Sequence, residues 1–242
     1  MQVAPGIHIV VGPDHGIGDR FDCTMYAVET AVGTLLFDAG AGRDPAILLH
    51  AINAAALSKP VVALFLTHAH ADHSGGAATI GEAFDVQIMA GKMTAGIVAS
   101  GDEATMSLDR ARQAGIYPAN YRYTRCLTVP VEDSRELEFG ETSIRPIATP
   151  GHSADHMSYL VRSADFRALF VGDALFDGGR VALQDTWDCS VPNTCDSIRR
   201  LAKEDFELFL PGHGPISTIG GTTHVASAMS RINALLCPAL YL

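Results

Sequence analysis

The chain has 242 residues, of which 48% are apolar and 18% are charged, and its formal net charge at pH 7 is −10. This length suffices for a substantial buried core, and the ordinary composition, without low-complexity tracts, excludes a mainly disordered state. The negative charge disfavours a general affinity for nucleic-acid phosphates or anionic membranes. We therefore expect a small-molecule partner and neither nucleic acid nor a membrane, and we keep a homodimer open.

Three features bear on the cellular compartment. The amino terminus, MQVAPGIHIVVG, lacks the basic start, apolar stretch and cleavage site of a secretory signal. The longest strongly apolar run, Val61–Leu66, is far too short for a transmembrane helix. The odd number of cysteines, without a C-x-x-C pair, favours free thiols in a reducing compartment. These are Cys23, Cys126, Cys189, Cys195 and Cys237. We expect a cytoplasmic protein.

Strand and helix signals alternate in the first quarter of the chain. The predicted strands are Ile7–Val11, Thr24–Glu29, Thr34–Phe37 and Val61–Leu66. Gly33 lies in a turn that can join the second and third strands as a hairpin. Asp44 and Pro45 supply an N-cap and a first-turn proline for a helix through about Leu57. Because the last strand is apolar throughout, we expect it to be buried on both faces.

The alternation continues in the remainder of the chain. Residues from about Lys92 to Gln113 are predicted to be helical and are followed by a stretch rich in Tyr and Arg, so we interpret residues 91–125 as an insertion beside the site. Further strands are predicted at Cys126–Val131, Ser143–Ala148, Met157–Val161, Ala168–Val171 and Leu208–Leu210, and helices at Thr194–Lys203 and after Thr222. No linker divides the chain, which favours one α/β domain, residues 1–242, of sheets covered by helices.

Four residues of metal-ligating type follow the buried strand directly. The segment reads Thr67-His68-Ala69-His70-Ala71-Asp72-His73. Two histidines separated by one small residue can bind one metal ion, while Asp72 and His73 at the following turn can face a second. Gly75-Gly76 then lets the backbone turn tightly as a helix begins. A single histidine here would be read as a surface residue, but the cluster predicts metal binding because a bound cation makes such crowding favourable.

Three more strand-like runs end in a ligand residue: Pro150-Gly151-His152, Gly172-Asp173 and Gly212-His213. The candidates are then His68, His70, Asp72, His73, His152, Asp173 and His213. This set is too large for one tetrahedral zinc ion but suits two that share a carboxylate. The sequence therefore predicts a binuclear site with two zinc ions per chain, with iron and manganese as the alternative metals.

An H-x-H-x-D-H segment followed by PGH, GD and late GH elements is similar to the signature of the metallo-β-lactamase superfamily, and the likeness spans nearly the whole chain. The resemblance implies a four-layer αβ/βα sandwich of two similar halves, with the metals at one edge between two central sheets. It assigns a first metal ion to His68, His70 and His152, a second to Asp72, His73 and His213, and the bridging position to Asp173.

Two positions outside the ligand set also match the superfamily. The segment Leu36–Gly40 resembles its early strand-end motif, in which Asp38 would support the metal-binding loop. From the residues alone, Asp38 is equally well a turn residue. His156 lies four residues after His152, and we interpret it as a supporting residue at most, not as a ligand.

The expected chemistry follows from paired metal ions. Metal binding can lower the pKa of water from 15.7 to about 7, which supplies hydroxide for attack on a carbonyl carbon near neutral pH. Asp72 can orient this nucleophile and later pass a proton to the leaving group. No Gly-x-Ser-x-Gly elbow or phosphate loop offers competing machinery. We therefore expect a zinc-dependent hydrolase.

The segment Gly172–Arg180 indicates which branch of the superfamily the chain resembles. It is similar to the corresponding segment of glyoxalase II and persulfide dioxygenase relatives. A bridging Asp173 argues against a true β-lactamase, so the resemblance favours cleavage of an ester, thioester or lactone. Only 29 residues follow His213, which leaves no room for the glutathione-binding domain of glyoxalase II. Quorum-sensing lactonases commonly carry a tyrosine where this chain has Phe176.

Three alternatives stay open. The first is a mononuclear iron persulfide dioxygenase-like oxidoreductase, which the full ligand set disfavours. The second is a phosphodiesterase or nuclease of the same fold, which the acidic charge disfavours. A non-enzymatic binding module is the third, and it is weakened because every ligand position is filled.

Two segments could line a substrate pocket. The region Met93–Arg125 could form a lid over an apolar acyl group, although ordinary packing of an inserted helix and loop is the more common arrangement. Trp187 and Cys189 follow the Asp173 loop, and for them core packing is the more common explanation.

Overall fold

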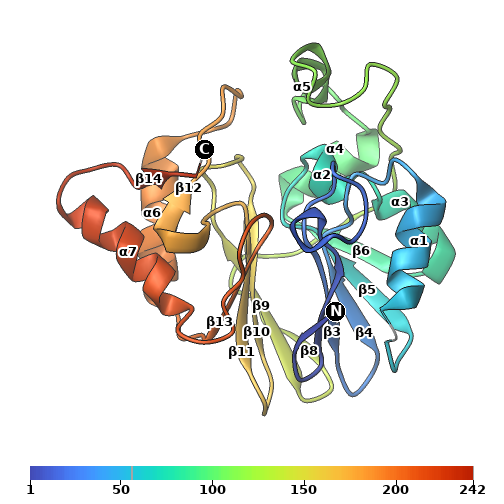
Figure 1. Ribbon diagram of the computed structural model, residues 1–242, viewed down its shortest axis with the longest axis horizontal. Helices are drawn as coiled ribbons and strands as arrows, with labels where there is room; N and C mark the ends of the chain where they lie inside the picture. Colours follow the sequence, from blue (N-terminus) through green and yellow to red (C-terminus); the bar gives the residue numbers. More distant parts are fainter. Residues whose placement is uncertain (56, 242) are drawn as a thin grey trace. The chain divides into compact units, whose positions relative to one another are not determined.

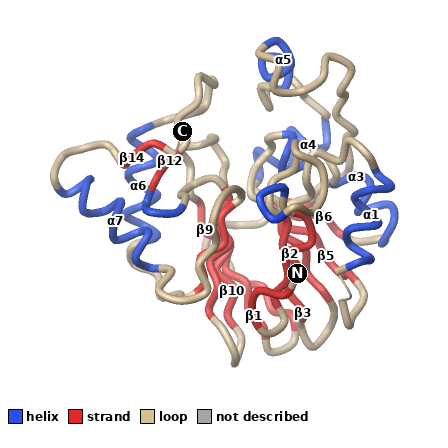
Figure 2. The backbone as a smooth tube through the Cα atoms, viewed as in Figure 1, coloured by secondary structure: helices blue, strands red, loops and turns tan. Residues whose placement is uncertain are grey.

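The computed structural model of the protein describes residues 1–55 and 57–241. The chain divides into two compact units, Met1–Val131 and Glu132–Leu242. In each unit, helices pack on a β-sheet (Figure 1; Figure 2). Each unit therefore has the helix layer and the sheet layer that the predicted α/β fold class requires.

The first unit contains a seven-stranded sheet in which the strands lie in sequence order. The strands are β1 Gln2–Ala4, β2 Ile7–Val11, β3 Met25–Glu29, β4 Thr34–Phe37, β5 Val61–Phe65, β6 Gln87–Ala90 and β7 Val129–Pro130. Neighbours from β1 to β4 are antiparallel, and those from β4 to β7 are parallel. The parallel pairing brings the carboxyl ends of β4 and β5 to the same edge of the sheet.

The helical segments of this unit are η1 Pro13–His15, α1 Pro45–Ala54, α2 Ala71–Ser74, α3 Ala77–Phe84, α4 Lys92–Ser100 and α5 Leu108–Gln113. As predicted, α1 begins at Pro45, and the Asp44 side chain accepts hydrogen bonds from the N–H groups of Ala46 and Ile47. The helix ends at Ala54 instead of about Leu57, and residue 56 of the predicted helix lies outside the described residues.

The prediction of one continuous helix in the insertion is wrong. The segment from about Lys92 to Gln113 forms two helices, because Gly101 takes a left-handed φ of 68° and ends α4. Its N–H donates to the carbonyl oxygen of Ile97, which is a common way for a helix to close.

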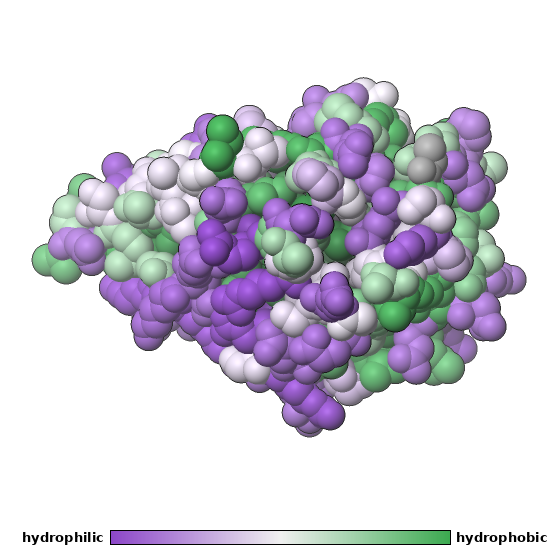
Figure 3. Space-filling view, turned by 90° about the horizontal axis from the view of Figure 1, so that it is seen from below, coloured by the Kyte–Doolittle hydropathy of each residue, from purple (hydrophilic) through white to green (hydrophobic). Residues whose placement is uncertain are grey.

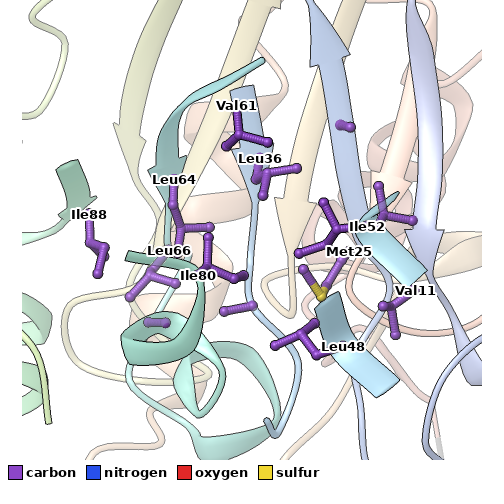
Figure 4. Close-up of a cluster of buried hydrophobic side chains, with 14 of the residues drawn as sticks. Val11, Met25, Leu36, Leu48, Ile52, Val61, Leu64, Leu66, Ile80 and Ile88 are labelled. Atoms are coloured by element: carbon purple, nitrogen blue, oxygen red, sulfur yellow. The ribbon is translucent and has the colours of Figure 1, made fainter. Parts of the chain in front are cut away.

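The core of the first unit lies between its helices and the sheet. Leu48 and Ile52 from α1 and Ile80 from α3 belong to the same buried cluster as Leu36 and Leu64 from the strands (Figure 4). Burying each of these side chains stabilises the fold by about 1.5–3 kcal/mol. The packing fixes the helices on the sheet whose edge carries the histidine-rich segment.

The second unit has a five-stranded sheet in the order β13-β11-β10-β9-β8. Its elements are β8 Leu137–Phe139, β9 Thr142–Ala148, β10 Met157–Arg162, β11 Arg167–Gly172, η2 Asp177–Gly179, β12 Arg180–Val181, α6 Val191–Leu201, β13 Leu208–Pro211, α7 Thr222–Asn233 and β14 Ala239–Leu240. Helix α6 begins at Val191, earlier than the predicted Thr194, because the Ser190 hydroxyl caps the N–H of Asn193. Buried residues of α6 and α7 form a core with β9, β10, β11 and β13.

The helices, the surface and the cysteines can be compared with what the sequence predicted about membrane spans and free thiols. None of the helices in the described part of the chain is both long and apolar enough to cross a membrane. On the face drawn in Figure 3, polar side chains are interspersed with apolar ones. All five cysteines are free, as predicted, and Cys23 is the buried one.

Candidate metal centre

The edge of the first sheet brings Asp38 to the histidine-rich segment. Asp38 follows β4, and its N–H donates to the carbonyl oxygen of Phe65 at the end of the parallel strand β5 (2.8 Å). The Asp38 Oδ1 atom accepts the N–H of Thr67 (2.8 Å), and Oδ2 lies 2.8 Å from His73 Nδ1. Asp38 is buried and adopts a left-handed φ of 60°. These contacts make Asp38 a support for the histidine loop, as the superfamily resemblance implies.

The bond to Asp38 decides which nitrogen of His73 can bind a metal ion. A carboxylate accepts only, so Nδ1 carries the proton and Nε2 presents a lone pair. That Nε2 atom lies 3.7 Å from Oδ2 of Asp72. The His73 side chain is fully buried, whereas that of Asp72 is 24% exposed. The two residues thus form a candidate ligand pair in which only the carboxylate is open to solvent.

His68 and His70 form a second candidate ligand pair. Nε2 of His68 lies 2.9 Å from Nδ1 of His70, and the Thr67 hydroxyl lies 3.0 Å from Nδ1 of His68. Two imidazole nitrogens bound to one tetrahedral zinc ion would be about 3.3 Å apart. The small separation therefore fits two nitrogens directed at one ion.

Gly75 and Gly76 allow close approach of the backbone, which is a different role from the tight turn that we expected. Both have ordinary negative φ values, −63° and −83°. A Cβ atom would lie 2.3 Å from the carbonyl oxygen of Ala41 at Gly75 and 2.1 Å from that of Ala39 at Gly76. Only glycine lets the loop after Asp38 touch the end of α2.

The second unit places its three candidate ligands together. β9 and β11 point the same way, since each is antiparallel to β10, and β13 is parallel to β11. His152, Asp173 and His213 follow these strands and so lie at one edge of the sheet. Oδ2 of Asp173 lies 3.5 Å from Nε2 of His152 and 3.7 Å from Nε2 of His213. One carboxylate thus contacts two imidazoles, as a bridging ligand would.

His156 holds the backbone of Asp173 in place. Its Nε2 atom accepts the N–H of Asp173 (3.0 Å), so the proton is on Nδ1, which lies 2.9 Å from the Thr149 hydroxyl. That hydroxyl in turn donates to Ser158 (2.9 Å), and Ser158 donates to the carbonyl oxygen of Val171 (3.1 Å). Both ring nitrogens of His156 are used in this buried chain, which excludes it as a metal ligand in this arrangement.

Cys23 lies beside Asp38 and His73, a position that was not predicted from the sequence. Cys23, Asp38 and His73 each place one potential ligand atom within 4.8 Å of the others. Burial raises the pKa of the Cys23 thiol to about 12, so the sulfur is protonated in the metal-free protein. A lone cysteine in a strand-like region gives no sequence signal for such a position.

The insertion packs against the histidine loop. Met106, Leu108, Tyr117 and Tyr121 share a buried cluster with Ala41, Ala69 and Ala71. The Tyr121 hydroxyl donates to the carbonyl oxygen of Ala41 (2.5 Å). Met93, which we considered for a lid, is 45% exposed. Ordinary packing therefore accounts for most of this segment.

Trp187 corrects an expectation, because its side chain is 57% exposed and does not pack in the core. It lies in the loop before α6. Cys189, in the same loop, is half-buried and accepts the N–H of Gln184 at 3.4 Å.

A serine, a histidine and an aspartate also meet in the second unit, but not as a hydrolytic triad. Ser217 Oγ lies 2.8 Å from Nε2 of His224, and Asp177 Oδ1 lies 3.6 Å from Nδ1. Nδ1 accepts the N–H of Gly178 (3.0 Å), so the proton is on Nε2, where a general base would need a lone pair. Burial lowers the pKa of His224, which favours the neutral ring.

Comparison with known proteins places the chain in a family. The sequence model of the metallo-beta-lactamase superfamily matches residues 18–213. The chain belongs to this superfamily. The match includes all seven candidate ligands and Asp38, and it confirms the family that the motif order indicated.

Relatives and solved structures agree with this membership. The chain is 29% identical over 156 residues to "Probable metallo-hydrolase YqgX" of Bacillus subtilis (strain 168), which covers 64% of this chain and 69% of that protein. It is 24% identical over 216 residues to an "Atrochrysone carboxyl ACP thioesterase" of Aspergillus fumigatus, covering 88% of this chain and 58% of that protein.

The solved metallo-β-lactamase of Cronobacter sakazakii with a HARLDQ motif resembles the chain in fold. The TM-score is 0.72 at 19% identity, covering 97% of this chain and 93% of that chain. The predicted metallo-β-lactamase fold is thereby confirmed.

Proposed function

We propose that the protein is a binuclear metal-dependent hydrolase that cleaves an ester, thioester or lactone bond of a small molecule. One observation carries the proposal. The two ligand pairs of the first unit and the Asp173-centred trio of the second unit together supply the donor set of two metal ions that share a carboxylate. Membership of a superfamily with metallo-hydrolase relatives supports it.

In the proposed centre, His68, His70 and His152 hold one ion, Asp72, His73 and His213 hold the other, and Asp173 bridges them. Imidazole nitrogens with few carboxylates favour zinc, and iron and manganese are the alternatives. The donor set fits these ions because Asp38 fixes a lone pair on His73 Nε2, and because the pair His68 and His70 directs two nitrogens at one point.

Bound metal ions would activate water and polarise the scissile carbonyl. The residues of the chain perform the remaining tasks. Asp72, the partly exposed member of its pair, orients the attacking water, accepts its proton on a carboxylate oxygen and passes it to the leaving oxygen or sulfur. Asp38 and His156 do not meet substrate and hold His73 and Asp173 in place.

The substrate class is supported by the name of the Aspergillus relative, which is a thioesterase. Phe176 is fully buried and stacks on Tyr241, with ring centroids 4.3 Å apart. It therefore contributes to the core and offers no hydroxyl to a substrate. We further propose that the partner is a small molecule, with no nucleic acid or membrane involved, and that the enzyme acts in the cytoplasm.

A hydrolysis screen of the metal-loaded protein tests this proposal. Lactones, thioesters, aryl esters, phosphodiesters and β-lactams are compared, and turnover of one of the first three classes is expected to be fastest. Ser217→Ala serves as the control and should retain full activity, because the His224 tautomer excludes a serine nucleophile. Oxygen uptake with one iron ion per chain, or turnover of phosphodiesters alone, would overturn the proposal.

A further inference from the structure

Within the insertion, residues 117–123 are fixed in place by an ion pair between Arg112 and Glu103. Arg112 Nη2 donates to Glu103 Oε2 (2.7 Å), and both side chains are largely shielded from solvent. Arg112 also donates to the carbonyl oxygen of Tyr121 (3.1 Å), while Glu103 accepts the N–H of Tyr123 (2.8 Å). The tyrosines of this segment are thus presented from a fixed backbone.

Tyr123 reaches the short helix α2, which carries Asp72 and His73. Its hydroxyl lies 3.0 Å from Ser74 Oγ and 3.1 Å from the carbonyl oxygen of Ser74. Ser74 Oγ in turn donates to the carbonyl oxygens of Ala69 (3.0 Å) and His70 (3.1 Å). Tyr123 is therefore connected to the backbone of both ligand pairs through one buried serine.

Tyr117 reaches the same helix at its carboxylate. The ring is buried and stacks between Phe21 and Tyr121, at centroid distances of 5.7 and 5.2 Å. Its hydroxyl hydrogen-bonds to the side chain of Asp72. A carboxylate only accepts, so the Tyr117 phenol is the donor. Tyr121, between the other two in sequence, bonds to Ala41 instead.

We propose that Tyr117 and Tyr123 are positioning residues, which together form a tyrosine clamp that holds Asp72 and His73 in the geometry of the second metal ion. The partly exposed Asp72 carboxylate could otherwise rotate towards solvent. A donor held by two stacked rings limits it to one orientation, and Ser74 fixes the backbone on which it is carried. This inference rests on the binuclear centre proposed above.

Titration of the metal-free protein with Co²⁺ tests the clamp without an activity assay, since the visible spectrum reports each bound ion. In Tyr117→Phe, the dissociation constant of the second Co²⁺ should rise about tenfold or more, as is typical when a residue that supports a ligand is lost. Tyr123→Phe should show a smaller rise, because it acts through Ser74. The first equivalent should bind as in the wild type in Tyr117→Phe, because Tyr117 contacts Asp72 and neither His68 nor His70.

Tyr121→Phe is the matched control, because it removes a hydroxyl from the same aromatic stack that bonds to Ala41 and not to α2. It should lower thermal stability and leave both Co²⁺ affinities unchanged. Phenylalanine preserves the stacked rings, and the Tyr117 and Tyr123 variants are independent of each other.

Unchanged affinity for the second ion in Tyr117→Phe would overturn the clamp, and so would an equal loss for both ions or in Tyr121→Phe. A wild type that binds a single ion would overturn the clamp together with the binuclear centre. Two bound ions with no hydrolysis of any substrate would reject the proposed function alone, and the comparison of variants would still decide the clamp.

Discussion

Replacing Asp72 with alanine is expected to lower kcat/KM for the best substrate by about 100- to 10,000-fold, the usual contribution of a positioned proton acceptor and donor. The same change removes a proposed ligand of the second metal ion, so that ion should be lost at lower chelator concentration. The reason is geometric, since Asp72 Oδ2 lies 3.7 Å from His73 Nε2 and belongs to the more exposed side chain of the pair. Steady-state kinetics and metal content are measured on the same preparation.

The control for Asp72→Ala is Glu82→Ala, which removes an exposed carboxylate from α3 in the same unit. This variant should match the wild type in kinetics and in metal content. Near-normal turnover of Asp72→Ala would contradict the role assigned to this carboxylate.

Asp38→Asn is expected to lower the affinity for the second metal ion by about 10- to 100-fold, although Asp38 is not one of the proposed ligands of that ion. Asparagine has nearly the shape of aspartate, and its oxygen can still accept the N–H of Thr67. Its amide nitrogen would then donate to His73 Nδ1, which moves the proton of the ring to Nε2 and removes the lone pair that binds metal. Competition with a chelator measures the affinity, and the fold is followed by thermal unfolding.

Asp22→Asn is the matched control for Asp38→Asn, because Asp22 is another buried carboxylate of the same unit and accepts the N–H groups of Ala41 and Asp19 (both 2.8 Å). It should lower stability while its metal affinity stays close to that of the wild type. An Asp38→Asn protein that binds both ions as tightly as the wild type would show that the tautomer of His73 is not set by Asp38.

Much of the fold could be predicted because its signals are local. The apolar run Val61–Phe65 and the Asp44-Pro45 cap each specify an element within a few residues. The break at Gly101 was missed because glycine inside a helical pattern is tolerated often enough to be passed over. The exposure of Trp187 was missed because burial depends on neighbours that lie elsewhere in the sequence.

The proposed ligands could be predicted from the sequence because of their residue types and their positions at strand ends. Histidine and aspartate at the ends of strands are few, and parallel strands bring their carboxyl ends to one edge of a sheet. The contacts that support these ligands could not be predicted in the same way. The bond of Tyr123 to Ser74 joins residues 49 positions apart, and neither residue type signals a metal site. Only the three-dimensional packing of the insertion shows which tyrosine reaches which backbone group.

Metal analysis combined with chelation tests the binuclear centre most directly. The purified protein is treated with a strong chelator, dialysed, and assayed on its best ester, thioester or lactone substrate while zinc is added back in measured equivalents. We expect activity to fall to the uncatalysed rate on removal of metal and to return in full at two zinc ions per chain. Undiminished hydrolysis by protein shown to be free of metal would contradict the binuclear mechanism.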